Sequence, residues 1–427
     1  MSNLSELLPA GAGAKSASFV ASGTLGSGVT VALKADGTVS VVEETALSVI
    51  LGTSVSWTSS TISDFTQLAY DSTNNKVVIA YQDKTNNGYG TAVVATVSGT
   101  TLTFGTPVVF ESASSEYIAP TFDAANGKVV IAYRDRGVNA GVCVVGTVSG
   151  TSISFGTPVE FEGGDTLYIS STYDSANGKV VFAFQDTADA NSGKCRVGTV
   201  SGTSISFGSE QTFDTGSVNA TGISYDSASG KVVIAYRDSG NSNYGTAIVG
   251  TVSGTSITYG SPIVFDSVNS SYTKAVYDST NNKTVVTYKI ASPAGVYAKV
   301  GTVSGTSISF GSRATLTTNS PEYVNSAYDN TAKAVVTSFW DTTAGQGSIQ
   351  IGTVSGTSIS YGSAIQLVSG QSTWNSLVYD ANAGKTVIAY ADSADADFAA
   401  VLQAGGTSTN NTDFKGIKDQ DIANTAT

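Results

Sequence analysis

The stretch Thr147–Phe161, TVSGTSISFGTPVEF, decides the fold because the chain repeats it. Its first five residues recur every 51 or 52 positions, beginning at Thr96, Thr147, Thr199, Thr251, Thr302 and Thr353. A second motif recurs with the same spacing. It consists of an aromatic residue and an Asp, followed by a turn and an apolar run. Its aromatic residues are Tyr70, Phe122, Tyr173, Tyr225, Tyr277, Tyr328 and Tyr379. A fixed period of this length indicates one array of similar units rather than several unrelated domains.

Each repeat is predicted to form four antiparallel strands. In the second repeat they cover 117–123, 128–135, 141–150 and 152–161. The second strand is a nearly continuous apolar run, which is typical of a strand buried on both faces. The fourth alternates apolar and polar residues, which is typical of an outer strand with one face in water. Four antiparallel strands in every 50 or so residues favour a β-propeller.

The two phrases differ in number, seven copies against six, and this difference predicts how the array closes. Gly52–Trp57 matches Gly150–Phe155, but no inner strands precede it, whereas 379–406 supply inner strands without an outer one. We therefore predict an all-β chain with a seven-bladed β-propeller over 49–406. The N-terminal strand would close the last blade and so remove the exposed edges of an open array.

The flanking residues fall outside the repeat. Residues 1–48 are predicted to form an N-terminal arm and a small β-hairpin used for docking or assembly. The hairpin is expected because Val29–Val42 alternates apolar and polar residues around Asp36-Gly37, a dipeptide that suits a tight turn. Residues 407–427 are interpreted as a polar C-terminal tail.

Composition argues against several classes of function. The chain has no histidine, which removes the commonest general base and metal ligand. With 21 basic and 33 acidic residues its net charge is −12, unlike that of a nucleic-acid-binding protein. Without a long apolar stretch or a signal-peptide pattern, neither membrane insertion nor signal-dependent export is expected. Cys143 and Cys195 hold the same position in adjacent repeats, where others carry mostly Ala, and are interpreted as small buried thiols.

One set of connections varies between repeats while another is nearly uniform. Turns between first and second strands read DSTNNK, DAANGK, DSANGK and DSASGK, whereas those between second and third strands differ widely, as in 83–91, 135–142 and 238–246. Two interpretations stay open: the varied loops form a binding surface on a rigid scaffold, or they drift because nothing constrains them. Under the first, the candidate binding residues, whose amides and rings suit a glycan, are Asn86, Asn87, Tyr89, Arg136, Asn139, Asn241, Asn243 and Tyr244.

Two further residue types recur once per repeat. Five residues before the aromatic-Asp phrase lies another aromatic, at Phe65, Tyr117, Tyr168, Tyr272, Tyr323 and Trp374, with Ala220 as the exception. These rings could form a ligand platform near one mouth, although packing between blades is the favoured interpretation. An Asp follows the second strand in six repeats and is interpreted as a turn cap, at Asp83, Asp135, Asp186, Asp238, Asp341 and Asp392.

No catalytic residue, metal site or cofactor is predicted. Two runs are rich enough in oxygen atoms to bind Ca²⁺ weakly. They are Asp186, Asp189 and Asn191, and Asp392, Asp395 and Asp397. Neither run has the spacing of an established calcium-binding loop.

The amino-acid sequence of the repeat resembles that of repeats in a known group of proteins. KVVIAYRDSGNSNYGTAIVGTVSGTSITYGSPIVF (231–265) is similar to repeats in structural and tail-fibre-like virion proteins of marine bacteriophages, including phages of cyanobacteria. FVASGTLGSGVTVALKADGTVSVV (19–42) resembles the β element that often precedes such repeats. The resemblance implies a virion location, with synthesis in the host cytoplasm and release by lysis.

The leading hypothesis is a non-enzymatic virion structural protein, such as a tail fibre, spike or capsid-surface appendage, that presents a propeller face to the host surface. Its expected partners are other virion proteins, in a homo-oligomer or symmetric assembly, and a host-surface glycan. Two alternatives stay open: a polysaccharide-degrading enzyme on a propeller scaffold, and a purely structural decoration or array subunit.

Overall fold

The computed structural model describes residues 20–21, 31–33, 38–41, 49–58, 63–392 and 396–405. The chain divides into two compact units, Met1–Ser48 with Gly405–Thr427, and Val49–Ala404. The smaller unit contains strands β1 (Val20–Ala21), β2 (Val31–Leu33) and β3 (Thr38–Val41). β3 pairs antiparallel with β2, as the two strands of the predicted hairpin should, and parallel with β1. Its predicted turn at Asp36-Gly37 and the tail 407–427 lie outside the described residues.

The inner strands of the larger unit follow the predicted repeat. Its first strands are β6 (Ser63–Asp71), β10 (Val108–Asp123), β15 (Thr166–Asp174), β20 (Val218–Asp226), β24 (Ile263–Asp278), β29 (Pro321–Asp329) and β34 (Thr373–Asp380). The second strands are β7 (Lys76–Asp83), β11 (Lys128–Asp135), β16 (Lys179–Asp186), β21 (Lys231–Asp238), β25 (Lys283–Ala291), β30 (Ala334–Asp341) and β35 (Lys385–Ala391). The third strands are β8 (Tyr89–Ser98), β12 (Ala140–Ser149), β17 (Ser192–Ser201), β22 (Tyr244–Ser253), β26 (Ala294–Ser304), β31 (Gln346–Ser355) and β36 (Asp397–Ala404). We number the repeats 1 to 7 in the order of these first strands.

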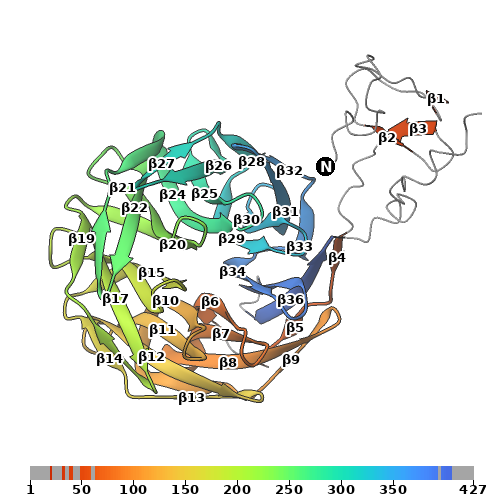
Figure 1. The fold of residues 1–427 in the computed structure, drawn as a ribbon. Helices are drawn as coiled ribbons and strands as arrows, with labels where there is room; N and C mark the ends of the chain where they lie inside the picture. Colours follow the sequence, from red (N-terminus) through yellow and green to blue (C-terminus); the bar gives the residue numbers. More distant parts are fainter. Residues whose placement is uncertain are drawn as a thin grey trace, which may run out of the picture. The chain divides into compact units, whose positions relative to one another are not determined.

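The strands of the larger unit form five antiparallel sheets, two of nine strands and three of five. The nine-stranded sheets arise because β10 and β24 each pair with the third strand of one repeat and then become the first strand of the next. Figure 1 shows the sheets of this unit standing side by side in a ring. All-β architecture with antiparallel strands is therefore confirmed.

The outer strand differs from the prediction. Residues 152–161 form two short strands, β13 (Ser152–Phe155) and β14 (Val159–Glu162), which both pair with β12. The break follows Gly156, whose N–H still donates to the carbonyl O of Val145 at 2.9 Å in the register of β13, whereas Val159 pairs with Cys143 in a register shifted by one residue. The corresponding outer pieces are β9 (Thr101–Phe104), β18 (Ser204–Phe207), β19 (Gln211–Asp214), β23 (Ser256–Tyr259), β27 (Ser307–Phe310), β28 (Ala314–Thr317), β32 (Ser358–Tyr361) and β33 (Ile365–Ser369).

The N-terminal outer strand pairs with the last inner strand, as the mismatch in repeat counts predicts. β4 (Val49–Leu51) and β5 (Val55–Ser56) both lie antiparallel to β36. Leu51 is opposite Leu402, and Ser56 is opposite Phe398. Segments more than 350 residues apart in sequence are thus hydrogen-bonded neighbours (Figure 1).

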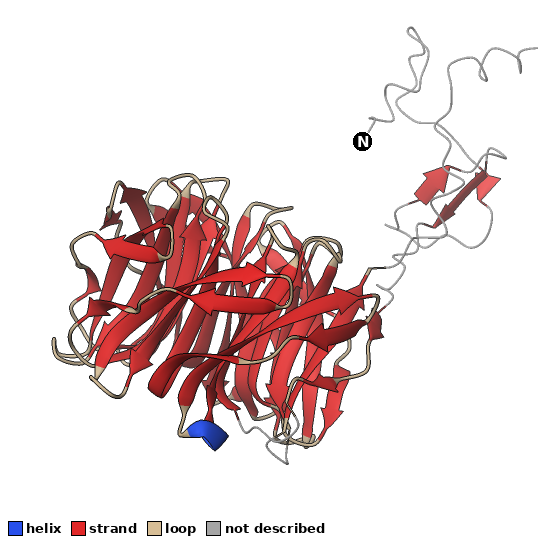
Figure 2. Ribbon diagram, turned by 90° about the horizontal axis from the view of Figure 1, so that it is seen from below, coloured by secondary structure: helices blue, strands red, loops and turns tan. Residues whose placement is uncertain are grey.

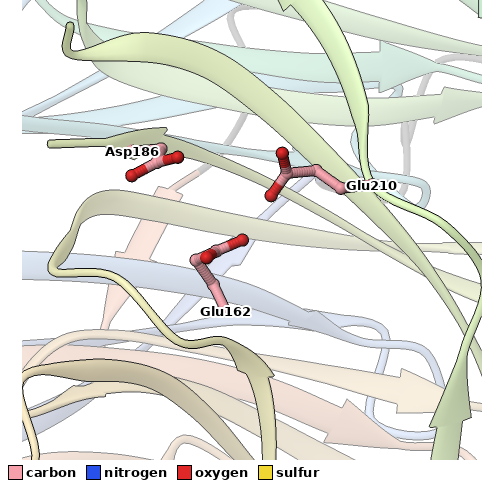
Figure 3. A group of neighbouring side chains, drawn as sticks. All are labelled: Glu162, Asp186 and Glu210. Atoms are coloured by element: carbon pink, nitrogen blue, oxygen red, sulfur yellow. The ribbon is translucent and has the colours of Figure 1, made fainter. Parts of the chain in front are cut away.

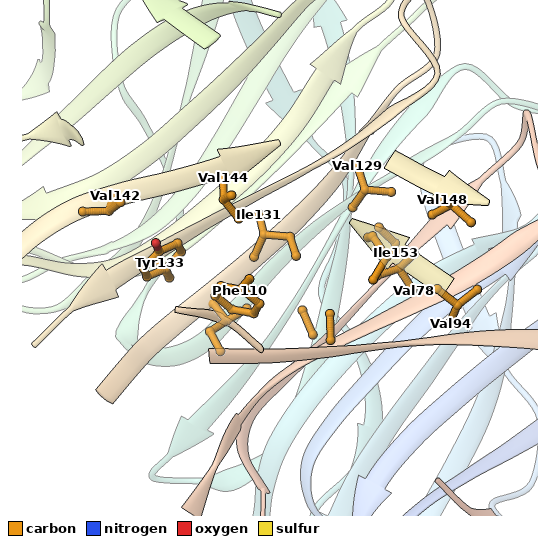
Figure 4. Packing of buried hydrophobic residues seen from close by; sticks show 14 of the residues in the cluster. Val78, Val94, Phe110, Val129, Ile131, Tyr133, Val142, Val144, Val148 and Ile153 are labelled. Carbon is orange, nitrogen blue, oxygen red and sulfur yellow. The ribbon is translucent and has the colours of Figure 1, made fainter. Parts of the chain in front are cut away.

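The hydrophobic core lies between neighbouring repeats. The second strands are almost wholly buried, as in β11, where every residue after Lys128 is buried. Figure 4 shows Val78 and Val94 of repeat 1 gathered with Ile131 and Ile153 of repeat 2 in one cluster. Because each repeat shares its core with the next, burial of apolar surface holds adjacent sheets together.

The repeated stretch also places a glycine against the following repeat. A Cβ built on Gly156 would lie 1.9 Å from the carbonyl O of Thr203, the last residue of the next TVSGT phrase. The same approach to a Thr carbonyl recurs at Gly52, Gly105, Gly208, Gly260 and Gly311. A Cβ built on Gly362 would meet only the carbonyl O of Ile351, at 3.9 Å. In the next repeat the third strand β36 pairs with the N-terminal strand β4, so no TVSGT turn joins its third and outer strands there.

No described helix has the length and apolar character needed to cross a membrane.

Candidate functional site

The varied loops and the starts of the first strands lie at the same end of the ring, which we call the variable end. Within repeat 1, Ser63 at the start of β6 is paired with Asp83 at the end of β7. The loop after Asp83 contains the short 3-10 helix η2 (Lys84–Asn86), which projects from one end of the ring in Figure 2. The opposite end carries the nearly uniform turns.

The Asp residues that follow the second strands cap these loops, as predicted. Asp83 Oδ1 accepts hydrogen bonds from the backbone N–H groups of Thr85 and Asn86, at 3.0 and 3.1 Å. Asp135, Asp186, Asp238, Asp341 and Asp392 accept backbone N–H groups in the same way. The caps fix where each loop leaves its rigid strand.

The aromatic residue near the start of each first strand has an unusual backbone conformation. It sits in a β-bulge: in repeat 1, Asp64 pairs with Gln82 and Gln67 with Ala80, so one residue of β6 is extra. The φ values lie between 48° and 53° at Phe65, Tyr117, Tyr168, Tyr272, Tyr323 and Trp374, a group that we call the collar. A left-handed conformation costs a residue with a side chain about 1–2 kcal/mol. The bulge redirects these six side chains toward the axis of the ring.

The collar surrounds a cavity of about 610 Å³. Ring centroids of neighbouring repeats are 5.0 Å apart for Phe65 and Tyr117 and 4.5 Å apart for Phe65 and Trp374. The chain of ring contacts continues from Tyr117 to Tyr168 at 5.3 Å, and on the other side from Trp374 to Tyr323 at 5.2 Å. All six collar side chains are partly exposed and line the cavity.

This arrangement agrees in part with the favoured interpretation of packing between blades, because Phe65, Tyr117 and Tyr272 pack against buried clusters that span neighbouring repeats. The rings do pack between repeats, but their partly exposed faces line a cavity at the variable end. The eight loop residues proposed from sequence lie around that end and do not line this cavity. Asn87 lines a smaller hollow of about 350 Å³, which it shares with Phe65 of the collar.

The eight loop residues fall into groups that belong to repeats 1, 2 and 4. Arg136 and Asn139 are exposed beside β11, as are Asn87 and Asn241 in their own loops. Asn86, Tyr89, Asn243 and Tyr244 are partly buried. Asn243 accepts a hydrogen bond from Nε of Arg237 at 2.9 Å, which fixes one of these loops to a cavity-lining residue.

Ion pairs engage the carboxylates that directly precede two collar residues, Glu116 before Tyr117 and Glu322 before Tyr323. Arg134 donates from Nη1 to Glu116 at 2.8 Å and from Nη2 to Asp165 of the next repeat at 2.7 Å. Lys289 likewise lies 2.5 Å from a carboxylate oxygen of Glu322 in the next repeat, and its ammonium sits over the Tyr272 ring. These contacts between repeats hold the collar in place.

Three carboxyl groups meet between repeats 2 and 3, outside the residues that line the cavity. Ligand oxygens of Glu162, Asp186 and Glu210 lie within 4.8 Å of one another and converge in Figure 3. Burial, then the hydrogen bond and charge of Glu210, raise the pKa of Glu162 to about 7. Burial opposes ionisation of Glu210, but the hydrogen bonds from Glu162 and Lys194 leave its pKa below the ordinary value. A proton on Glu162 and the Lys194 ammonium thus compensate part of the charge of this cluster.

The replacement of a recurring Tyr by Phe in repeat 3 explains why these carboxyl groups meet. In repeats 2, 4 and 5 the second strand carries a Tyr whose hydroxyl donates to a carboxylate of the preceding repeat, as Tyr133 does to Glu111 at 2.9 Å. Repeat 3 carries Phe184 at this position, and Glu162 is the corresponding carboxylate. Glu162 therefore lacks the phenol donor and turns to Glu210.

Several members of the two acidic runs considered for Ca²⁺ lie among the described residues. Asp189 lies 2.6 Å from the Lys194 ammonium, whereas Asp186 belongs to the carboxyl cluster. In the other run Asp397 accepts a hydrogen bond from Ser63 at 2.5 Å, and Asp395 lies outside the described residues. The described oxygen ligands of each run thus engage different partners.

The two cysteines are buried and unpaired, as predicted. Burial raises the pKa of the Cys195 thiol to about 12 and that of Cys143 further still. Neither thiol is suited to nucleophilic chemistry.

Comparison with known proteins identifies a fold but no family. No family model and no curated protein matches the sequence. Among solved structures, the BP39L lectin from Burkholderia pseudomallei superimposes with a TM-score of 0.59 at 10% identity, covering 80% of this chain and 97% of the lectin. The periplasmic gluconolactonase PpgL from Pseudomonas aeruginosa gives 0.51 at 10% identity, covering 71% of this chain and 86% of the enzyme.

At such low identity these likenesses concern architecture alone. One of the two neighbours is a lectin and the other a lactonase, so the fold by itself does not choose between binding and catalysis. The chain is an all-β protein whose five antiparallel sheets resemble those of β-propeller structures.

Proposed function

We propose that this protein is a non-enzymatic bacteriophage virion protein whose variable end binds saccharide on the host surface. In this proposal Val49–Ala404 is a seven-bladed β-propeller closed by β4 and β5, and the small β unit before it makes assembly contacts. The virion assignment is supported by the resemblance of the repeat sequence to repeats in virion proteins of marine bacteriophages. The saccharide assignment is supported by the site.

The observation that carries the saccharide assignment is the collar. Six aromatic side chains line one cavity, each on a backbone that its residue type disfavours. Strain of this kind persists where the surrounding fold imposes it, and it is common at binding sites. Flat apolar rings stack on the C–H faces of sugars, and among the described residues of the cavity wall Asn375 has a side-chain oxygen, Oδ1, without a hydrogen-bond partner.

Binding of the purified protein to an array of bacterial surface saccharides tests the proposal. Trp374→Ala should weaken binding about tenfold or more, which corresponds to about 1.4 kcal/mol. Tyr379→Ala is the matched control, because Tyr379 lies on the same strand, β34, at the opposite end of the ring. Equal affinity in wild type and Trp374→Ala would show that the saccharide binds away from the collar. No binding to any saccharide would leave a purely structural subunit as the better account.

The enzymatic alternative depends on the carboxyl cluster. Glu162, with a pKa of about 7, stands beside the ionised Glu210, and a general acid paired with a carboxylate is the arrangement of many glycosidases. Release of reducing ends from host polysaccharide, abolished in Glu162→Gln, would favour this alternative. Under the binding proposal no reducing ends are released.

A further inference from the structure

The collar is broken at one position, and the cavity's positive charge lies beside the break. Repeat 4 carries Ala220 at the collar position, with the same left-handed backbone at φ 49°. The described residues that line the cavity include two charged side chains, Arg237 and Lys274, and both are cationic. Arg237 pairs in register with Asn219, the neighbour of Ala220. Lys274 lies in the next repeat, where its Cα would be 2.8 Å from a Cβ built on Gly222.

Arg237 differs from its counterparts because the carboxylates that would pair with it are replaced. Arg134 occupies the same position in repeat 2 and binds Glu116 and Asp165. The corresponding positions around Arg237 carry Asn219 and Asn269. Among the described residues no carboxylate lies within ion-pair distance of Arg237, whose Nε donates a hydrogen bond to Asn243.

Lys274 is the second uncompensated cation. Its position in the other repeats is held by neutral residues, including Gln67, Ser170 and Asn325. The side chain is partly buried in the cavity wall, and loss of water there lowers the pKa of its ammonium to about 8. In the described part of the chain no carboxylate forms an ion pair with it.

We propose that the gap at Ala220 is a subsite for the carboxylate of an acidic saccharide, a uronic acid residue, held by Arg237 and Lys274. The inference rests on the proposed saccharide function and names the class of sugar. The small side chain of Ala220 leaves room where other repeats place a ring. A guanidinium binds carboxylate through two parallel N–H donors, and its desolvated surroundings strengthen that contact. Tyr272, beside the gap, offers a face for the sugar ring.

The net charge of the protein supports the gap at Ala220 as the place where an acidic saccharide binds. With a net charge of −12 the chain repels polyanions at long range. Carboxylates next to collar residues, such as Glu116 and Glu322, are already paired with cations of the protein. An acidic ligand therefore finds its favourable contact at the gap rather than over the surface at large.

Calorimetric titration with uronic acid trisaccharides tests the subsite. The probes are the trimers of galacturonate, glucuronate and mannuronate, each compared with its methyl ester, which keeps the sugar and removes the charge. At least one acid should bind ten times or more as tightly as its ester. Arg237→Gln and Lys274→Gln should each weaken binding of that acid about tenfold, as expected for a lost charge-assisted hydrogen bond, and leave binding of the ester unchanged.

The matched control is Lys231→Gln, which makes the same charge change at the opposite end of β21 and should leave binding of both probes unchanged. If acid and ester bind equally and Arg237→Gln has no effect, the subsite is wrong while saccharide binding stands. If a sulfated galactose trisaccharide binds and no uronate does, the carboxylate assignment is overturned in favour of sulfate. If no saccharide binds, the proposed function and the subsite fail together.

Discussion

At the scale of single residues, Gly156 shows why the repeated stretch tolerates little change. Its Cα approaches the backbone of the next repeat so closely that a methyl group would fall 1.9 Å from the Thr203 carbonyl O. The backbone is not free to move, because Thr203 belongs to a turn fixed between β17 and β18. The phrase is therefore a contact between repeats as well as a strand signal.

Gly156→Ala should destabilise the protein by about 1–3 kcal/mol, because the methyl group must separate two packed repeats. Gly362→Ala is the matched control, since the nearest atom to its added Cβ is 3.9 Å away, and it should be nearly neutral. Urea unfolding of both variants measures the difference. Equal losses of stability would show that the contact with the next repeat is unimportant.

Phe184→Tyr should restore the phenol donor that Glu162 lacks and make stability less dependent on pH. In the wild type the folded-state pKa of Glu162, about 7, exceeds its ordinary value of 4.5. The stability that this proton contributes is full below about pH 4.5 and is lost as pH rises through 7. In the variant the melting temperature should therefore fall less between pH 5 and pH 8, by about 1–3 °C.

Phe339→Tyr provides the control for that experiment. It makes the same change in repeat 6, where the facing position carries Thr317 instead of a carboxylate. Its effect on the melting temperature should be the same at both pH values. A parallel pH-independent shift in Phe184→Tyr would contradict the assigned cause of the raised pKa.

At the scale of elements, the most informative feature is the bulged first strand. The spacing of the aromatic residues was readable from the sequence, and so was their recurrence in six repeats. The direction in which their side chains point could not be read from the sequence, because a strand without a bulge would turn Phe65 or Tyr117 toward a neighbouring sheet. One extra residue per strand decides whether these rings are core or cavity wall.

The closing strands β4 and β5 provide the second test at this scale. Deleting 1–58 should lower stability by about 3 kcal/mol or more, because it uncovers β36 and removes the buried Trp57. Deleting 1–48 should leave the melting temperature of the ring nearly unchanged, because it removes only residues of the other unit. Calorimetry compares the two, and size-exclusion chromatography should show self-association through the exposed edge only for the longer deletion.

At the scale of the whole molecule, closure predicts cooperative unfolding. Cys143 and Cys195 report on repeats 2 and 3, whereas Trp57, Trp340 and Trp374 report on repeats 6 and 7. If every repeat shares its core with two neighbours, thiol labelling and tryptophan fluorescence should change at one urea concentration. Labelling at lower urea than the fluorescence change would mean that the ring opens repeat by repeat, as a linear array does.

Much of the fold and part of the site could be predicted from the sequence. Strand positions, turn caps at residues such as Asp83 and Asp135, the buried thiols and the pairing of β4 with β36 all follow from a pattern that each copy repeats. The split outer strand could not be predicted, because the register shifts by one residue just after Gly156, where the strand lies against Thr203 of the next repeat. The collar was visible as a spacing, and its packing between repeats was expected, but the bulge that turns its rings toward one cavity was not.

The sequence by itself determined the repeat, the strand order within it and the way its ends meet, since these depend on local periodicity and on counting copies. Only the tertiary structure decided which side chains meet. The cavity joins residues from every repeat, and Glu162, Asp186 and Glu210 come from neighbouring sheets. The unpaired charge of Arg237 depends on what neighbouring strands place beside it. Contacts of this kind are set by how the sheets pack, and no residue's own neighbours in sequence specify them.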